Sequence, residues 1–279
     1  MATRTSVTQT GVTRTRDDAL GTEAHGRDGG AAPGEGGRPI GLVAALSWEV
    51  RPLLRRQSGA GRVEKDGPVY SFLARETPVH LTVAGVGAEN AYRAARRLLD
   101  RYRVRGLVTI GFAGGLADSL NAGDIVLADH VTDQRTGERF DCSGELSLNG
   151  LGPIEHAHRG GLLSVMEVVT AAAEKRKLAG KWGAVAVDME SAGVGRAASE
   201  SGVAFAAVKA ITDTAMQSIS FDFARCRSEH NGLSFWKIAR EGMRTSQAIR
   251  DVWMLAKGAR IAARALAEAL GSAELRGTR

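Results

Sequence analysis

Short apolar runs separated by helical segments fill the chain from Ile40 onward. Within these runs successive positions are apolar, which is typical of strands that are buried on both faces of a sheet. The pattern predicts strands at residues 40–46, 79–86, 106–111, 124–129, 184–189 and 203–211.

Helical spacing marks several segments between the predicted strands. Residues 89–103 place apolar side chains on one stripe, at Ala91, Ala94, Ala95, Leu98 and Tyr102. Residues 191–201 and the long C-terminal segments are also predicted to be helical. Because strands alternate with helices, we expect an α/β fold, a three-layer single domain with helices flanking a central, largely parallel or mixed sheet.

The start of the chain differs from the rest. It is rich in Thr, Gly, Arg and Asp and almost lacks large apolar side chains, so it buries too little surface to offset the entropy of ordering. We expect residues 1–39 to be a disordered tail or an over-extended reading frame. Residues 40–270 would form the folded domain and residues 271–279 a C-terminal tail.

Composition narrows the class of protein. The chain has 279 residues and 43% hydrophobic content, enough for a packed core. It contains no apolar run of the roughly 18 residues that a membrane span requires and no secretory signal core, so we expect a cytoplasmic protein. Cys142 and Cys226 are far apart, which indicates neither a disulfide framework nor a zinc site.

The net charge of +6 is scattered rather than clustered beside aromatic residues, so no nucleic-acid partner is predicted. The exception is segment 248–270, where apolar positions at helical spacing alternate with Arg250, Lys257, Arg260 and Arg264. Most such helices pack on their own domain. Peripheral contact with an anionic membrane surface is the alternative.

Acidic side chains follow three of the predicted strands. These are Glu49, Glu190 and Asp213, and the glycine-rich stretch GFAGG at 111–115 follows a fourth strand. Ligands bind at the carboxyl ends of strands in α/β sheets, so we expect these groups to converge on one edge. Helix capping is the alternative for each acid taken alone, but it does not account for the set.

Four segments resemble the signatures of the nucleoside phosphorylase and nucleosidase superfamily: IGLVAALSWEV, GFAGGLADSLNAGDIVLAD, AVAVDMESAGVGRAA and AAVKAITDTA. Within it, the chain is most similar to the branch of methylthioadenosine/S-adenosylhomocysteine nucleosidases and hopanoid-associated phosphorylase-like enzymes. The resemblance implies cleavage of the N-glycosidic bond of an adenosine-type nucleoside. It also implies a homodimer that needs no cofactor and no metal.

The resemblance implies a role for each acidic residue. Asp213 matches the acid that protonates purine N7, and burial favours the neutral carboxyl that this role needs. Glu190 matches the residue that binds the ribose 2′- and 3′-hydroxyls, and Met189 would pack on the sugar. Glu49 matches the base that activates water, with a solvated first-turn glutamate as the alternative. Asp188 is interpreted as a helix cap.

The nucleophile and the purine have predicted contacts of their own. Phe112 stands where the family usually has Ser or Thr, and a glycine-rich loop would offer backbone N–H groups to ligand oxygens. The stretch 160–178 would bind the purine edge. The residues expected to contact substrate in these two stretches are Gly111, Phe112, Ala113, Gly114, Val168 and Val169.

Water and phosphate are the two candidate nucleophiles. Phosphorylases of the superfamily carry a G-D-P-x-R loop and an Arg before the glycine-rich stretch, since phosphate favours bidentate cationic donors. This chain has ALSWE and Thr109 in these places, which favours hydrolysis. Arg51, Arg55 and Arg56 keep phosphorolysis open, with phosphate as a co-substrate.

The stretch 160–178 is more similar to the hopanoid-associated branch, which implies adenosylhopane, an adenosyl lipid, as substrate. Candidates for lining an apolar channel are FWKIA at 235–239, Trp253 and the basic C-terminal helix. A methylthioadenosine/S-adenosylhomocysteine nucleosidase is the alternative substrate class. A nucleoside-binding module without turnover and a membrane- or nucleic-acid-binding protein are the non-enzyme alternatives.

Overall fold

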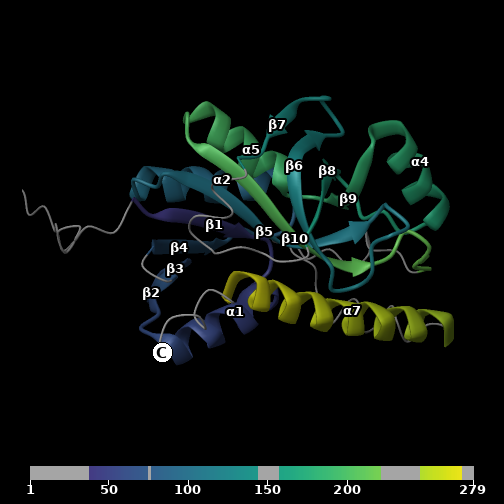
Figure 1. Ribbon diagram of the computed structural model, residues 1–279, viewed down its shortest axis with the longest axis horizontal. Helices are drawn as coiled ribbons and strands as arrows, with labels where there is room; N and C mark the ends of the chain where they lie inside the picture. The colour runs from purple at the N-terminus through teal and green to yellow at the C-terminus, as the bar shows by residue number, and fades with distance from the viewer. Residues whose placement is uncertain (1–37, 75–76, 144–156, 221–245, 272–279) are drawn as a thin grey trace, which may run out of the picture. The chain divides into compact units, whose positions relative to one another are not determined.

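The computed structural model describes residues 38–74, 77–143, 157–220 and 246–271. The predicted tails, apart from residues 38, 39 and 271, lie outside these ranges, as do Cys226 and the segment 235–239. In chain order the elements are β1 (Ile40–Ala44), α1 (Ser47–Ala60), β2 (Glu64–Asp66), β3 (Val69–Ala74), β4 (Thr77–Val83), α2 (Ala88–Arg101), β5 (Gly106–Gly115), β6 (Ile125–Asp133), β7 (Arg139–Asp141), β8 (His158–Ser164), α4 (Ala172–Trp182), β9 (Ala184–Asp188), α5 (Ser191–Glu200), β10 (Ala204–Asp213) and α7 (Ser246–Gly271) (Figure 1).

All six predicted strands are confirmed, as β1, β4, β5, β6, β9 and β10. The prediction missed β2, β3, β7 and β8. The hairpin of β2 and β3 begins with three exposed charged residues and turns at Gly67, whose φ is +58°. Strand β8 contains two consecutive glycines, which are depleted in strands. Neither pattern is the continuous apolar run that identified the other strands.

The strands form one mixed sheet in the order β10-β6-β8-β9-β5-β1-β4-β3-β2, with β7 paired to β6. Strand β10 also pairs with β5, so β5, β10, β6, β8 and β9 close into a ring. The pairs β1–β4, β1–β5, β5–β10, β6–β8 and β8–β9 are parallel, whereas β5–β9 and β6–β10 are antiparallel. The predicted α/β fold class is confirmed.

Helices cover both faces of the sheet, as three layers require. Figure 1 shows α2 and α5 on one side and α1 and α7 on the other. Between the sheet and the second pair lies an apolar cluster that includes Leu42, Leu53, Val208 and Leu266. Here α7 approaches β10 so closely that a Cβ atom at Gly258 would lie 2.0 Å from the carbonyl oxygen of Thr212.

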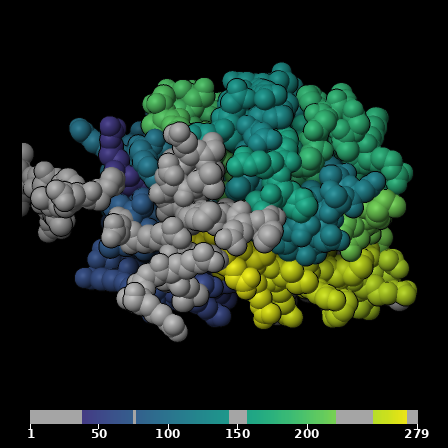
Figure 2. Space-filling model, in the orientation of Figure 1, coloured from purple at the N-terminus to yellow at the C-terminus, as the bar shows by residue number. Residues whose placement is uncertain are grey.

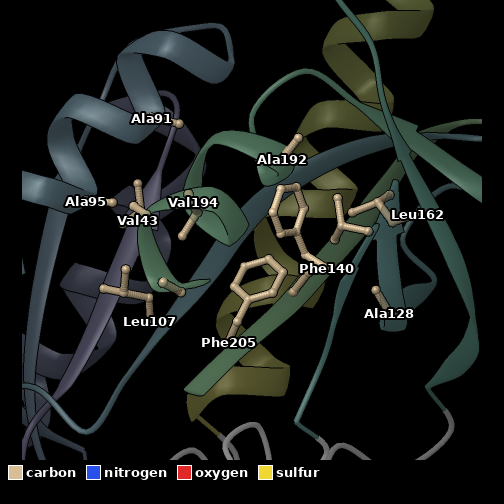
Figure 3. Close-up of a cluster of buried hydrophobic side chains, with 14 of the residues drawn as sticks. Val43, Ala91, Ala95, Leu107, Ala128, Phe140, Leu162, Ala192, Val194 and Phe205 are labelled. Carbon is tan, nitrogen blue, oxygen red and sulfur yellow. The ribbon is translucent and has the colours of Figure 1, made fainter. Parts of the chain in front are cut away.

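The opposite layer holds a second apolar cluster, seen in Figure 3. Ala91 and Ala95 of α2 meet Val194 of α5 there, above Leu107 of β5. Helix α2 buries a single apolar stripe, whereas α5 is buried over most of its length. Small side chains on both helices leave room for close helix packing.

Gly193 is the point of closest approach between α5 and α2. A Cβ atom at this position would lie 1.9 Å from the carbonyl oxygen of Ala88, which starts α2. This contact gives a physical reason for the small residues after Glu190. They let the neighbouring helix approach closely.

We predict that Gly193→Ala destabilises the fold. Alanine normally stabilises a helix interior relative to glycine by about 0.5–1 kcal/mol. Here the added methyl group meets backbone that has to move, and such overpacking costs about 1–3 kcal/mol. Urea unfolding checks the sign. The matched control is Gly180→Ala in α4, where a Cβ atom meets nothing within 4 Å and where stability should rise. Equal stabilisation by both changes would contradict the close approach.

Candidate active site

Glu49 lies in the first turn of α1 and is only 4% exposed. Its Oε2 accepts a hydrogen bond from the backbone N–H of Leu46, 2.9 Å away. A Cβ atom at Gly111 would lie 3.0 Å from the same oxygen, so glycine lets the carboxyl group approach β5. The predicted base is therefore desolvated, and the alternative of a solvated first-turn glutamate is wrong.

Burial raises the pKa of Glu49 to about 7, because a carboxylate loses solvation when it leaves water. The hydrogen bond from Leu46 and the positive charge of Lys209 oppose this shift without cancelling it. A carboxyl group with a pKa near neutrality is able both to accept and to release a proton at neutral pH, which is what a general base requires.

Glu190 lies between β9 and α5 and is 9% exposed. Its Oε1 accepts a hydrogen bond from the backbone N–H of Gly87, 2.8 Å away at the start of α2. Burial raises the pKa of Glu190, and the charges of Asp188 and Glu49 raise it further. Since Glu49 acts on Glu190 electrostatically, the two residues belong to one cluster. The contact with Gly87 was not predicted from the sequence.

Lys209 of β10 is a buried cation in this cluster. Its Nζ lies 2.9 Å from Oδ2 of Asp188 and 3.1 Å from Oγ1 of Thr109. Burial alone would lower the pKa of Lys209, but the charges of Asp188 and Glu190 outweigh burial and raise it. Asp188 also accepts a hydrogen bond from the backbone N–H of Ser191 at 3.1 Å. Glu190 occupies the N-cap position of α5, but the Asp188 carboxylate accepts from the first N–H of the helix and is also half of an ion pair.

Asp213 ends β10, and a Cβ atom at Gly114 of β5 would lie 3.4 Å from its Oδ2. Oδ1 accepts a hydrogen bond from the Thr212 hydroxyl at 2.6 Å, and Oδ2 accepts one from the ammonium group of Lys175 in α4. Sequence reasoning missed Lys175. The signal available was its spacing of three residues from the buried Leu178, which puts both on one helix face.

The glycine-rich stretch at 111–115 is the end of β5 and not the predicted loop. Gly114 pairs with β10 on one side and with β9 on the other, so the sheet uses backbone groups there. Glycines usually mark turns, which made the pattern misleading. Here they make room, because Gly111, at φ +139°, admits Glu49 and Gly114 admits Asp213.

Two other residues of this stretch are oriented by their neighbours. The ring of Phe112 packs edge-on against Trp48, with centroids 5.1 Å apart, and Trp48 is 45% exposed. Ala113 is buried, and its carbonyl oxygen lies 3.3 Å from the Thr212 hydroxyl oxygen. Because Trp48 directly precedes Glu49 in the sequence, its ring brings Phe112 of β5 against the first turn of α1.

Met189 and Val169 lie in one apolar cluster formed by residues of β8, β9, α4 and their neighbours. Val169 is buried and Met189 is partly buried. Val168 is half-buried on the segment that precedes α4. The structure thus brings two of the predicted substrate contacts together, and their contact with a ligand stays a prediction.

We expected the strand ends to converge on one edge of a parallel sheet, but the structure brings them together in a different way. Strands β1, β5 and β10 are parallel, but β9 is antiparallel to the end of β5. The chain that leaves β9 toward Glu190 therefore runs back along β5 toward Gly111. Gly111 and Gly114 are three residue steps apart along β5, at most about 10 Å of extended chain. Glu49 and Asp213 approach the same strand end at these two positions.

Within the described ranges, no group of three or more His, Cys, Asp or Glu side chains could hold a metal ion. No helix of the same ranges is long and apolar enough to cross a membrane. The contacts described above involve carboxyl groups, buried lysines and backbone N–H groups.

The sequence model of the Phosphorylase superfamily matches residues 39–235 of this chain, which include Glu49, Glu190 and Asp213. The chain belongs to the Phosphorylase superfamily. It is an enzyme, and every acidic residue of the cluster around β5 lies within the matched region.

Solved structures of nucleosidases share the fold of this Phosphorylase superfamily member. The 5′-methylthioadenosine/S-adenosylhomocysteine nucleosidase of Helicobacter pylori is 17% identical at a TM-score of 0.63, covering 86% of this chain and 98% of its own. Futalosine hydrolase of the same organism is 15% identical at a TM-score of 0.63, covering 85% and 97%. The corresponding methylthioadenosine nucleosidase of Neisseria meningitidis is 18% identical at a TM-score of 0.59, covering 84% and 99%.

We predict that stability falls as pH rises from about 4.5 to about 7, in part through Glu49. The folded chain keeps the Glu49 proton up to about pH 7, whereas the unfolded chain releases it near pH 4.5. The folded state therefore binds more protons in this window, and raising the pH favours unfolding. Glu49→Gln should remove this part of the pH dependence, on the order of 2 kcal/mol.

Urea unfolding of wild type and Glu49→Gln at the two ends of this window measures the effect. The exposed Glu174 of α4 offers a control, because Glu174→Gln should keep the wild-type pH dependence. An unchanged slope in Glu49→Gln would show that Glu49 ionises normally in the folded protein.

Proposed function

We propose that this chain cleaves the N-glycosidic bond of an adenosine-type nucleoside by hydrolysis and releases adenine. The observation that carries the proposal is the cluster of two buried carboxyl groups, Glu49 and Glu190, with Asp213 on the same strand end. Cleavage of a ribosyl C–N bond needs a group that activates the nucleophile, a group that holds the sugar and an acid for the leaving base. The three carboxyl groups correspond to these three needs.

Asp213 would protonate the purine, since a neutral base leaves more readily than an anion. Glu49 would accept a proton from the attacking water, for which its pKa of about 7 is suited. Glu190 would bind the ribose diol through its two oxygens. Donation from the two hydroxyls favours the carboxylate form, so sugar binding would offset the effect of burial on Glu190.

The placement of the cations near Glu49 favours hydrolysis over phosphorolysis. Within the described part of the chain, the cation that acts on Glu49 is Lys209, and it is engaged with Asp188 and Thr109. Arg51 is exposed and lies two residues from Glu49, so the two side chains leave α1 on different faces. Phosphate is bound well by the paired N–H donors of an arginine side chain. The contacts described here do not place such a pair of donors beside Glu49.

An apolar 5′ substituent, as in adenosylhopane, is the preferred substrate class. The exposed Trp48 and its partner Phe112 offer an apolar surface next to Glu49. Helix α7, whose exposed side is seen in Figure 2, contacts the residue before Asp213. It carries exposed apolar side chains at Ile249, Trp253, Met254 and Ile261. Methylthioadenosine or S-adenosylhomocysteine is the alternative, and peripheral membrane contact through α7 and a homodimer are further parts of the proposal.

Release of free base from adenosine, inosine, uridine, methylthioadenosine and an adenosyl lipid, each with and without phosphate, tests this function. We expect adenine release without phosphate. Asp213→Asn should lower kcat by about 10²- to 10⁴-fold, the usual contribution of a general acid. Asp100→Asn, an exposed site on α2, is the matched control and should keep the wild-type rate.

Strict dependence on phosphate would replace hydrolysis by phosphorolysis. Preference for methylthioadenosine over the adenosyl lipid would assign the alternative substrate class. Binding of purine nucleosides without release of base by the wild-type chain would overturn the proposal in favour of a binding module.

A further inference from the structure

Lys175 is completely buried in the first half of α4. Its ammonium group has three donors, and each has an acceptor: the carboxylate of Asp213, the carbonyl oxygen of Thr214 at 2.8 Å and that of Gln217 at 3.2 Å. Lysine is rarely buried in this way unless it is paired. The side chain is therefore built into the end of β10 and the turn that follows it.

The contacts of Asp213 indicate a role for Lys175 beyond stabilising the fold. Both carboxylate oxygens already accept hydrogen bonds, one from the Thr212 hydroxyl and one from Lys175. A carboxylate that accepts on both oxygens has no proton to donate. To act as an acid, Asp213 has to receive one, and an ammonium group gives up a proton far more readily than a hydroxyl group does.

Further hydrogen bonds connect the turn after Asp213 to the segment that is expected to bind the purine. The Ile219 N–H donates to the carbonyl oxygen of Thr170 at 2.9 Å, and the Ala172 N–H donates to the Ser218 hydroxyl at 3.0 Å. Val168 and Val169 lie just before these contacts. Lys175 thus belongs to a clamp between the end of β10 and the start of α4.

We propose that Lys175 is a positioning residue that supplies Asp213 with the proton given to the leaving purine. This inference rests on the proposed function. When bound substrate excludes water, an ion pair is costly and a neutral amine–acid pair is less so. The N–H bond of Lys175 breaks as the O–H bond of Asp213 forms.

The remaining steps keep charge and atoms in balance. The Asp213 proton passes to purine N7 while the electron pair of the breaking C–N bond stays with the purine. Water adds to the ribosyl carbon, and its proton goes to Glu49. After product release, the Lys175 amine regains a proton from solvent, and Glu49 returns one to solvent.

The test compares leaving groups that need protonation with one that does not. Lys175→Met should lower kcat for adenine release from adenosine by at least about 10²-fold, as expected for loss of acid catalysis. Hydrolysis of 4-nitrophenyl β-ribofuranoside should stay close to the wild-type rate, because nitrophenolate leaves without a proton. Lys177→Met on the exposed side of α4 is the matched control and should keep both rates.

Lys175→Arg separates proton supply from charge. A guanidinium group keeps the positive charge but does not release its proton, so adenine release should stay slow while the nitrophenyl riboside is hydrolysed. Recovery of adenine release in Lys175→Arg, or a full rate in Lys175→Met, would overturn the inference and leave the proposed function intact. Equal loss on both substrates in both variants would assign Lys175 a purely structural role. Absence of base release by the wild type would overturn the proposed function and this inference together.

Discussion

The buried ion pair between Lys209 and Asp188 is the interaction on which the site depends. An uncompensated charge in the protein interior costs several kcal/mol, and this cluster contains Glu49 and Glu190 as well. Lys209 balances them from β10, while its contact with Thr109 joins it to β5. Without this cation, Glu49, Glu190 and Asp188 would have no opposite charge among the contacts described, and Glu49 and Glu190 would favour their neutral forms more strongly.

The ion pair also explains why the chain needs both a parallel and an antiparallel neighbour for β5. The parallel strand β10 brings Lys209 and Asp213 to one side of β5. The antiparallel strand β9 brings Asp188 and the following Glu190 from the other direction. Opposite charges that are close in space thus come from strands that approach the site along different paths.

Much of the fold could be predicted because strands buried on both faces require continuous apolar runs. Glu49, Glu190 and Asp213 could be found because each follows such a run. Strands β2 and β7 were missed because they are three residues long and charged, and β8 was missed because two glycines precede its short apolar run. Lys175 and the pairing of Lys209 were missed because contact partners far apart in the chain depend on strand register and helix orientation, which a local pattern does not contain.

The closed ring of strands has a further consequence for association between chains. Unpaired strand edges can template intermolecular sheets, and short, charged edges resist this. Among the described strands, β5, β10, β6, β8 and β9 have neighbours within the ring, and the sheet ends at β2 and β7. Each of these two is three residues long and carries both a basic and an acidic side chain. The longest strands are thereby kept from edge-to-edge aggregation.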